Sequence, residues 1–333
     1  MIRVNNIHLS LDYDDKSVRK AVAQQLRIEE KSIKSCKIFR RSVDARKKDN
    51  IYFLTTVDAE LNINEDKVCK KCGNAQIARK YEYNQMKFGN APSPIVVGAG
   101  PAGLFAALIL ARSGANPILI ERGRDVDRRT ADVNRFWTSG KLDITSNVQF
   151  GEGGAGTFSD GKLNSGTKDI RQRKVLEEFV SHGAPDEILY NAKPHIGTDM
   201  LKGTIKNIRN EIIELGGRVM FETKLVSMAF SDNKLKSITV ETANGDEIIE
   251  TDNVILAIGH SARDTFEMLY DLKLPIEAKP FSVGARIEHL RQKVDKAQYG
   301  RFAGNKKLGS ANYKLSTHLD NGRGVYTFCM CPG

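Results

Sequence analysis

The chain has no long apolar run, no secretory leader pattern and few cysteines, and each shortage excludes a class of protein. No apolar stretch approaches the ~20 residues that a membrane-spanning helix needs, so we expect no membrane span. Residues Met1–Asn6 lack the basic-then-apolar layout of a signal peptide. Five cysteines is an odd and low number for a secreted disulfide framework, so the sequence predicts a cytoplasmic protein.

What the chain does have is length, a sufficient apolar content and an uneven positive charge. Its 333 residues leave room for about two domains, and 40% hydrophobic residues suffice for packed cores. Of the net charge of +10, much sits in residues 1–94, which hold 19 Lys and Arg against 12 Asp and Glu. Either an anionic partner such as RNA or a solvated basic face explains this excess, and we favour the solvated face.

Residues 1–88 predict a small α+β domain, and residues 89–94 a turn-rich linker. The expected elements follow the order strand, helix, strand, strand, helix, strand, which is typical of a ferredoxin-like fold. They span Ile2–Leu11, Lys16–Leu26, Ser35–Val43, Asn50–Val57, Asn64–Cys72 and Ile77–Tyr83. Asn64 is the expected N-cap of the second helix.

Cys69 and Cys72 form a Cys-x-x-Cys pair in this domain. A structural zinc site would need a second pair nearby, and the next cysteine is Cys329. A redox pair would be expected at a strand-to-helix junction. We therefore interpret the pair as incidental and predict no metal site.

The chain is organised around residues 95–121, where a glycine turn joins two short apolar strands through a helix. The first strand is followed by Gly98, Gly100 and Gly103 in the spacing of a dinucleotide-binding turn. Gly98 allows the tight turn, and Gly100 lets the backbone approach a pyrophosphate without a Cβ in the way. Gly103 allows the helix to pack closely on the strand.

Two further features complete this dinucleotide site. The helix N-terminus offers free N–H groups and a positive dipole end to the phosphates. Glu121 ends the second strand, eighteen residues after Gly103, and can accept hydrogen bonds from both ribose hydroxyls. The motif by itself does not separate FAD from NAD.

A second glycine-rich stretch, Gln149–Lys162, would let backbone amides approach a flat or phosphorylated ligand. The alternative is a flexible surface loop, but Phe150 and Phe158 bracket the stretch and would need burial. The remaining pattern predicts an amphipathic helix, then four strands, and finally a buried parallel strand. The last three of the four strands are expected to form a meander. These elements span Asp199–Leu215, Arg218–Phe221, Lys224–Phe230, Leu235–Thr242, Glu247–Glu250 and Asn253–His260.

Together, the glycine turn, Glu121, the meander and Ala257-Ile-Gly259 resemble the FAD domain of glutathione-reductase-type flavoproteins. That class usually has Ala-Thr-Gly where this chain has Ala257-Ile-Gly259. More closely, the sequence resembles bacterial FAD-dependent dehydrogenases, also labelled NAD(FAD)-utilizing dehydrogenases, which typically carry a ferredoxin-like front domain. This resemblance covers residues 95–333 and is carried by Gln149–Leu163, Ala257–Asp264 and Pro280–Glu288.

The resemblance implies an α/β fold with an FAD-binding Rossmann-like domain over residues 95–279 and the start of an incomplete substrate (cap) domain over residues 280–333. It implies FAD as the cofactor. The backbone of Leu225 would contact adenine, the second glycine loop would approach the pyrophosphate and flavin, and Gly259 would close the pocket beneath the cofactor. The cofactor-binding residues implied in this way are Gly98, Ala99, Gly100, Pro101, Ala102, Gly103, Glu121, Arg122, Gly153, Gly154, Gly156, Thr157, Leu225, Ala257 and Gly259.

Two features depart from the family pattern. Residues Thr157–Lys162 hold no cysteine where the disulfide reductases carry a redox pair, which excludes a dithiol mechanism of that kind. Proteins of this type also return to the FAD domain with a strand, a Gly-Asp that touches the ribityl chain, and a helix. No such Gly-Asp follows Pro280, so we expect the chain to be a C-terminally truncated version of a longer protein.

The sequence thus predicts a FAD-dependent oxidoreductase that passes hydride or electrons through bound flavin to an unidentified small molecule. A lone histidine after a strand is more often structural, and we assign no catalytic residue. Cys329 and Cys331 would point to opposite faces of a strand, which disfavours a disulfide between them. The polar residues nearest the family-like motifs are Lys162, His260, Arg263, Asp264 and Arg286.

No second glycine motif with a strand and a helix around it is present, so a nicotinamide reductant, NAD(P)H, would dock transiently. The alternative function is an RNA-associated flavoprotein or an RNA-binding module that uses residues 1–94. An inactive remnant that folds only in part is the third interpretation.

Overall fold

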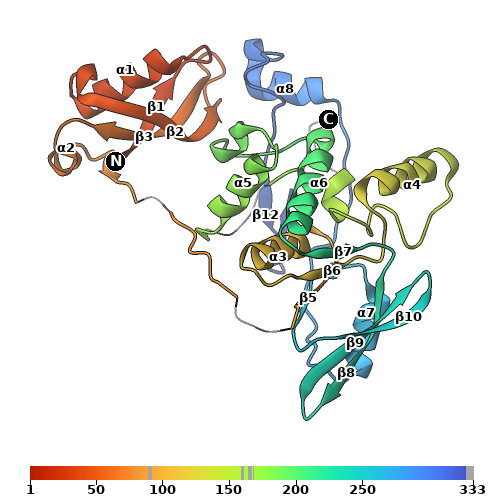
Figure 1. Cartoon of the computed structure of the whole chain (residues 1–333). Coiled ribbons are helices and arrows are strands. Elements are labelled where there is room, and N and C mark those ends of the chain that lie inside the picture. Colours follow the sequence, from red (N-terminus) through yellow and green to blue (C-terminus); the bar gives the residue numbers. More distant parts are fainter. Residues whose placement is uncertain (80, 89–91, 159–160, 164–166, 168, 328–333) are drawn as a thin grey trace. The chain divides into compact units, whose positions relative to one another are not determined.

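A computed structural model describes residues 1–79, 81–88, 92–158, 161–163, 167 and 169–327 (Figure 1). The chain divides into two compact units. The first unit contains Met1–Tyr81, Leu189–Pro194 and Phe281–Gly333, and the second contains Glu82–Ile188 and His195–Pro280. The sequence-based domain limits at residues 88, 94 and 279 stay predictions.

The first unit is built on a four-stranded antiparallel sheet with the strand order β2-β3-β1-β4. Helix α1 follows β1 and helix α2 follows β3, in the order that the sequence predicts. The side chain of Asn64 accepts a hydrogen bond from Lys67 N at 2.9 Å, which confirms Asn64 as the N-cap of α2. The elements are β1 (Ile2–Leu9), α1 (Asp15–Leu26), a 3-10 turn (Glu30–Ser32), β2 (Ile33–Asp44), β3 (Tyr52–Leu61), α2 (Glu65–Lys71) and β4 (Ala75–Ile77).

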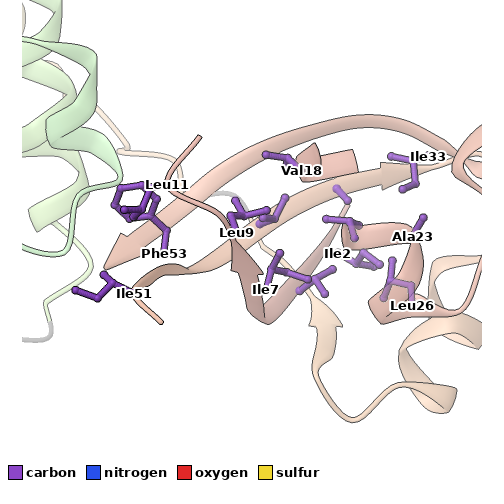
Figure 2. Close-up of a cluster of buried hydrophobic side chains, with 14 of the residues drawn as sticks. Ile2, Ile7, Leu9, Leu11, Val18, Ala23, Leu26, Ile33, Ile51 and Phe53 are labelled. Carbon is purple, nitrogen blue, oxygen red and sulfur yellow. The ribbon is translucent and has the colours of Figure 1, made fainter. Parts of the chain in front are cut away.

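The core of this unit follows from alternation along β1. Ile2, Val4, Ile7 and Leu9 are buried, and the shift from even to odd positions coincides with an irregularity in the pairing of β1 with β3. Helix α1 adds its own apolar face, and side chains from α1 and the strands gather in one cluster (Figure 2). The α1 residues in this cluster are Val18, Val22, Ala23 and Leu26.

The predicted last strand of this unit, Ile77–Tyr83, is wrong in position. Strand β4 spans Ala75–Ile77 and pairs with only three residues of β1. Because Ile77 already lies opposite Ile2, the first residue of β1, β4 ends there, and residues 78–79 and 81–83 form no strand.

The segment after residue 281 contributes to the same core. It forms α8 (Arg291–Tyr299), a 3-10 turn (Gly300–Phe302) and a hairpin of β12 (Ser316–His318) and β13 (Gly324–Tyr326). Val294, Tyr299, Leu308 and Ala311 are buried in the cluster that β1 and α1 form. Asp295 accepts a hydrogen bond from Ala311 N at 2.7 Å and ties α8 to the following loop.

The second unit contains a four-stranded parallel sheet with the order β11-β5-β6-β7. Its strands are β11 (Val254–Leu256), β5 (Ile95–Val97), β6 (Ile118–Ile120) and β7 (Arg218–Met220). Since β5 has β6 on one side and the much later β11 on the other, the connections diverge at the carboxyl end of β5. Such a switch point is where open α/β sheets bind ligands.

Helices cover one face of this sheet and a meander covers the other (Figure 1). Val96 and Leu119 pack in a cluster with α3 (Pro101–Arg112), α5 (Gln172–Ser181) and α6 (Thr198–Glu214). The alternate residues Ile95, Val97, Ile118 and Ile120 pack against the antiparallel strands β8 (Lys224–Ser231) and β9 (Lys234–Thr242). Strand β10 (Gly245–Glu250) completes the predicted meander, and α7 (Arg263–Asp271) joins the same cluster.

The second unit also contains α4 (Val126–Ser139) and 3-10 turns at Ala155–Phe158 and Asp186–Leu189. Strand β11 is parallel as predicted, but Ile255 and Leu256 are 40% and 39% exposed because β11 is the edge of the sheet. Within the described residues, no helix is both long enough and apolar enough to span a membrane.

Candidate dinucleotide site

A cavity of about 620 Å³ opens in the second unit where β5 ends. Its walls come from the glycine turn after β5, the end of β6, the loop at residues 149–155, the start of β8 and the segment after β11. All of these belong to one unit, and the volume is within the roughly 300–1,000 Å³ typical of ligand sites.

The glycine turn is closed so tightly that side chains are excluded from it. Gly98 has φ = +102°, and a Cβ on it would lie 2.5 Å from the carbonyl oxygen of Ala257. A Cβ on Gly103 would lie 1.8 Å from the carbonyl oxygen of Gly98. Helix α3 therefore begins against β5 with Gly100 as its N-cap and no side-chain cap, which leaves its first N–H groups facing the cavity end of the sheet.

Glu121 is buried, and its carboxylate joins three backbone segments. Oε2 accepts from Ala99 N at 2.8 Å, and Oε1 accepts from Gly123 N at 2.9 Å and Gly151 N at 3.0 Å. Glu121 also lines the cavity. A carboxylate offers about four lone-pair sites, so acceptor capacity remains for a ligand hydroxyl.

The second glycine-rich loop is fixed from beneath by Arg129 of α4, whose side chain is fully buried. Its guanidinium donates to the carbonyl oxygens of Asn147 at 2.9 Å, Val148 at 3.0 Å and Glu152 at 2.5 Å. It also donates to Thr157 Oγ1 at 3.3 Å. Burial lowers the pKa of Arg129 to about 10, which still leaves the group charged at neutral pH.

Glu152 of this loop is fully buried and connects it to two helices. Its Oε2 accepts from Val126 N, at the start of α4, at 2.7 Å, and from Arg209 Nη1 of α6 at 2.8 Å. Burial raises the pKa of Glu152. A further hydrogen bond runs from Gly153 N to Ala99 O at 2.8 Å, so the second loop is bound directly to the first turn.

Opposite charges meet at the rim of the cavity. Arg122 donates to both carboxylate oxygens of Asp264, at 3.0 and 3.2 Å, and its guanidinium lies 4.6 Å from the ring centre of Phe150. Lys224 pairs with the same carboxylate at 2.8 Å. Burial raises the pKa of Asp264, but the bonds from Lys224 and Arg122 outweigh it and hold the pKa well below its usual range.

The structure brings most of the sequence-predicted residues to this cavity. Those that line it are Gly98, Gly100, Pro101, Ala102, Glu121, Arg122, Gly154, Leu225, Ala257 and Gly259. Ala99, Gly103, Gly153 and Thr157 instead shape the walls through backbone contacts and close packing. Gly156 is exposed, with nothing within 4 Å of the position of a Cβ.

The candidate polar residues fall in different places. His260 lines the cavity and is exposed, whereas Arg263 begins α7 and Lys162 forms an isolated bridge with His195. Arg286 belongs to the first unit. Cys329 and Cys331 lie outside the described residues.

Cys69 and Cys72 are both free and half-buried, and Cys72 Sγ donates to Gln25 O at 3.4 Å. Among the described residues, no group of three or more His, Cys, Asp or Glu is arranged to hold a metal ion.

The sequence did not indicate several residues that lie outside the glycine motifs but support the site. Arg129 sits in a segment rich in charge, and the helical period there does not reveal which charged residue turns inward. Lys224 and Thr265 come close only because β8 and α7 meet at the cavity: Thr265 Oγ1 accepts from Arg122 at 2.8 Å.

The groups that line this cavity fit the phosphate-bearing half of a dinucleotide. The glycine turn lets the protein backbone approach a pyrophosphate closely. The N-terminus of α3 favours negative charge, and Arg122 adds a cation at the rim of the cavity. Glu121 stands at the end of β6 with acceptor capacity for ribose. Such a set of groups is typical of dinucleotide-binding α/β proteins.

Comparison with known families makes the class more specific. Residues 93–132 match the family model described as "FAD binding domain", and residues 280–333 match "FAD-dependent protein, C-terminal domain-like". Residues 1–60 match a domain of unknown function. In these two stretches the chain is similar to the FAD-dependent proteins that the models describe.

A relative from Clostridium beijerinckii, called "Uncharacterized protein", is 46% identical over 338 residues. The match covers 100% of this chain and 62% of the relative, so the chain spans less than two thirds of that protein's length.

Solved structures show only distant similarity. THI4 of Thermovibrio ammonificans is 16% identical, with a TM-score of 0.37 over 55% of this chain and 64% of its own. A 3-ketosteroid-delta4-(5alpha)-dehydrogenase of Rhodococcus jostii is 14% identical, with a TM-score of 0.31 over 50% of this chain and 48% of its own. At TM-scores this low, neither similarity bears on the fold or the function of this chain.

Proposed function

We propose that this chain binds FAD in the cavity at the end of β5 and acts as a FAD-dependent oxidoreductase on a small molecule. The observation that carries the proposal is the convergence of the glycine turn, Glu121 and Leu225 on one cavity of about 620 Å³. When bound, the flavin supplies the ability to accept and release hydride or electrons. The chain's residues bind the cofactor, orient it and exclude water around it.

Each group has a separate task in this proposal. The N–H groups at the start of α3 and the Gly98–Gly103 turn hold the pyrophosphate, and Glu121 accepts from the ribose. The backbone of Leu225 contacts adenine, and Gly154 and Gly259 border the cofactor. Gly153 and Thr157 act through the order of the second loop, and Gly156 is exposed in that loop with room for a side chain. No catalytic residue is assigned, and a nicotinamide reductant docks transiently.

The proposal is tested first by ligand choice. Binding should quench the fluorescence of FAD or of the protein during a titration. FAD should bind much more tightly than FMN, because the contacts proposed here are made with the adenylate half that FMN lacks. Competition by ADP should weaken FAD binding for the same reason. Equal binding of FAD and FMN, or no effect of ADP, would contradict the site.

Oxidoreductase activity is tested after loading. The bound flavin should be reduced by dithionite and reoxidised by at least one class of small acceptor faster than free FAD is under the same conditions. Reoxidation at the rate of free FAD with every acceptor would remove the enzymatic part of the proposal and leave a flavin-binding protein.

We also infer the finer fold classes. The order β2-β3-β1-β4, with helices after β1 and β3, supports a ferredoxin-like first unit. The meander of β8–β10 packed on a parallel sheet supports a glutathione-reductase-type second unit.

A further inference from the structure

A second cavity, of about 450 Å³, lies at one end of the antiparallel sheet in the first unit. Its lining comes from the end of β1 and the residues after it, from the start of β3, and from Phe302 and Asn305. These segments are distant in sequence, and the core that α8 shares with β1 and β3 brings them together. No part of the dinucleotide site contributes to this cavity.

Flat rings face this cavity. His8 of β1 and Tyr52 of β3 both line it, and their rings stack with centroids 4.5 Å apart and planes 23° apart. Tyr52 Oη donates to Asp44 Oδ2 at 3.1 Å, which fixes the ring, and His8 is exposed. Phe302, which is half-buried against the core, lines the cavity as well. Exposed rings on adjacent strands of a sheet are the usual platform for stacking nucleobases.

Positive charge from two remote segments gathers beside these rings. Lys47 and Lys48 lie in the loop before β3, and Arg301 donates to Asp49 O in that loop at 2.7 Å. A Cβ on Gly300 would lie 3.4 Å from the Cβ of Lys48, so the loop and the 3-10 turn are in contact. Both segments border the cavity through Asn50 and Phe302.

This charge is only partly neutralised. Residues 291–307 hold six Lys and Arg and a single acidic residue, Asp295. Asp295 is buried, accepts a hydrogen bond from Ala311 N and pairs with Arg291 at 3.7 Å. Lys307 pairs with Asp12 at 2.9 Å. Within the described part of the chain, Lys47, Lys48 and Lys306 are exposed and form no ion pair.

We propose that this cavity and its basic border bind single-stranded nucleic acid. A base stacks against the His8–Tyr52 pair or Phe302, while Lys47, Lys48 and Lys306 contact backbone phosphates. The rings favour a nucleic acid over an acidic protein or an anionic membrane, because stacking on aromatic rings is a contact that every nucleobase can make. The surface joins residues 46–48 with residues 301–307, so it is not a property of residues 1–94 alone.

The test is fluorescence anisotropy of the full chain with a labelled single-stranded oligo(rU) of about 12 nucleotides, without FAD. Binding should weaken steeply between about 50 and 200 mM salt. The double variant Lys47→Glu/Lys48→Glu should lose at least about tenfold in affinity and show a flatter salt dependence. The matched control is Lys70→Glu/Lys71→Glu on α2, which changes the charge equally and touches no residue of the cavity.

Stacking is tested separately at Tyr52. Tyr52→Phe keeps the ring but loses the hydrogen bond to Asp44, so it should lose little affinity, whereas Tyr52→Ala should lose about tenfold with an unchanged salt dependence. Circular dichroism of each variant confirms that it is folded. Because FAD is absent, failure here leaves the flavin proposal untouched.

Three kinds of result would overturn the inference. The first is no oligonucleotide binding at about 50 mM salt, or equal losses in the Lys47/Lys48 and Lys70/Lys71 variants. The second is binding of uridine monophosphate as tight as that of the oligonucleotide, which would make this a mononucleotide site. The third is tighter binding to phosphatidylserine vesicles than to the oligonucleotide.

Discussion

The carboxylate of Glu121 and the backbone N–H of Gly151 are joined by a hydrogen bond of 3.0 Å across thirty positions of sequence. This bond links the end of β6 to the second glycine-rich loop, while the other oxygen of Glu121 holds Ala99 in the first turn. Two motifs that are separate in the sequence therefore share one acceptor group. Cofactor affinity and the order of the second loop should consequently change together.

Replacing this carboxylate tests that link. In Glu121→Gln, the amide N–H₂ would face backbone N–H donors, because Ala99 N lies against one oxygen and Gly123 N and Gly151 N against the other. We expect the free energy of unfolding to fall by about 1–3 kcal/mol and FAD affinity to fall at least about tenfold. Glu250→Gln, an exposed change on β10, is the control and should alter neither quantity. Wild-type FAD affinity in Glu121→Gln would contradict the assigned role.

Gly103 and Gly156 are both expected at the cofactor site, but their replacement by alanine should have very different effects on stability. Gly103→Ala places a methyl group 1.8 Å from Gly98 O, so β5 and α3 must move apart. We expect a loss of stability of about 1–3 kcal/mol or more and a loss of FAD binding. Gly156→Ala meets nothing within 4 Å and should leave the unfolding temperature unchanged. Thermal unfolding with and without FAD measures both, and equal effects would contradict the packing described here.

Arg129 should be required for the second loop. Arg129→Met leaves the carbonyl oxygens of Asn147, Val148 and Glu152 without their buried donor, at an expected cost of at least about 3 kcal/mol. Arg129→Lys keeps the charge but cannot reach all three acceptors, so partial recovery is expected. The control is Arg218→Met, an exposed change on β7. Urea unfolding and FAD titration are the measurements, and wild-type values for Arg129→Met would show that the loop does not depend on this side chain.

An ion-pair network among α3, α5 and α6 should make stability pH-dependent. Glu211 accepts from Arg112 at 2.5 and 2.9 Å and from His182 Nε2 at 2.8 Å. The hydrogen bonds from Arg112 hold the pKa of Glu211 below its usual value of 4.5, against the opposing effect of burial. Such a group adds stability above its unfolded pKa, and that stability is lost as pH falls through the lower folded pKa.

Glu211→Gln should therefore be less stable than the wild type at pH 7, by about 1 kcal/mol because the side chain is partly exposed. The difference should shrink as the pH falls below the usual carboxyl pKa of 4.5 and then through the lower pKa of Glu211 in the folded protein. Thermal unfolding across this pH range measures it, and Glu214→Gln on the exposed face of α6 is the control. A difference that stays constant with pH would contradict the network.

Short-range patterns made the glycine turn, Glu121 and the meander predictable from sequence. Each is set by local requirements: Gly98 by its positive φ, Gly103 by close packing, and the meander by alternation and tight turns. The same local logic placed Asn64 as an N-cap. It failed for β4, whose length is decided by its partner β1 rather than by its own residues.

The features that could not be predicted from the sequence depend on packing between segments that are distant in the chain. The core of the first unit recruits Val294 and Ala311, although the apolar period of α8 says nothing about which unit it joins. Arg129 likewise gives no sign of burial, because its acceptors are backbone carbonyls that any residue carries. The cavity with His8 and Tyr52 exists only once these distant segments meet.

The most direct measurement is the visible absorption spectrum of the purified chain, recorded before and after addition of FAD and again after desalting. We predict a flavin spectrum that survives desalting, with bands shifted from those of free FAD, and its loss in Gly103→Ala but not in Gly156→Ala. A chain that remains colourless after incubation with FAD, or one whose flavin is removed completely by desalting, would contradict the assignment of the cavity at the end of β5 as an FAD site.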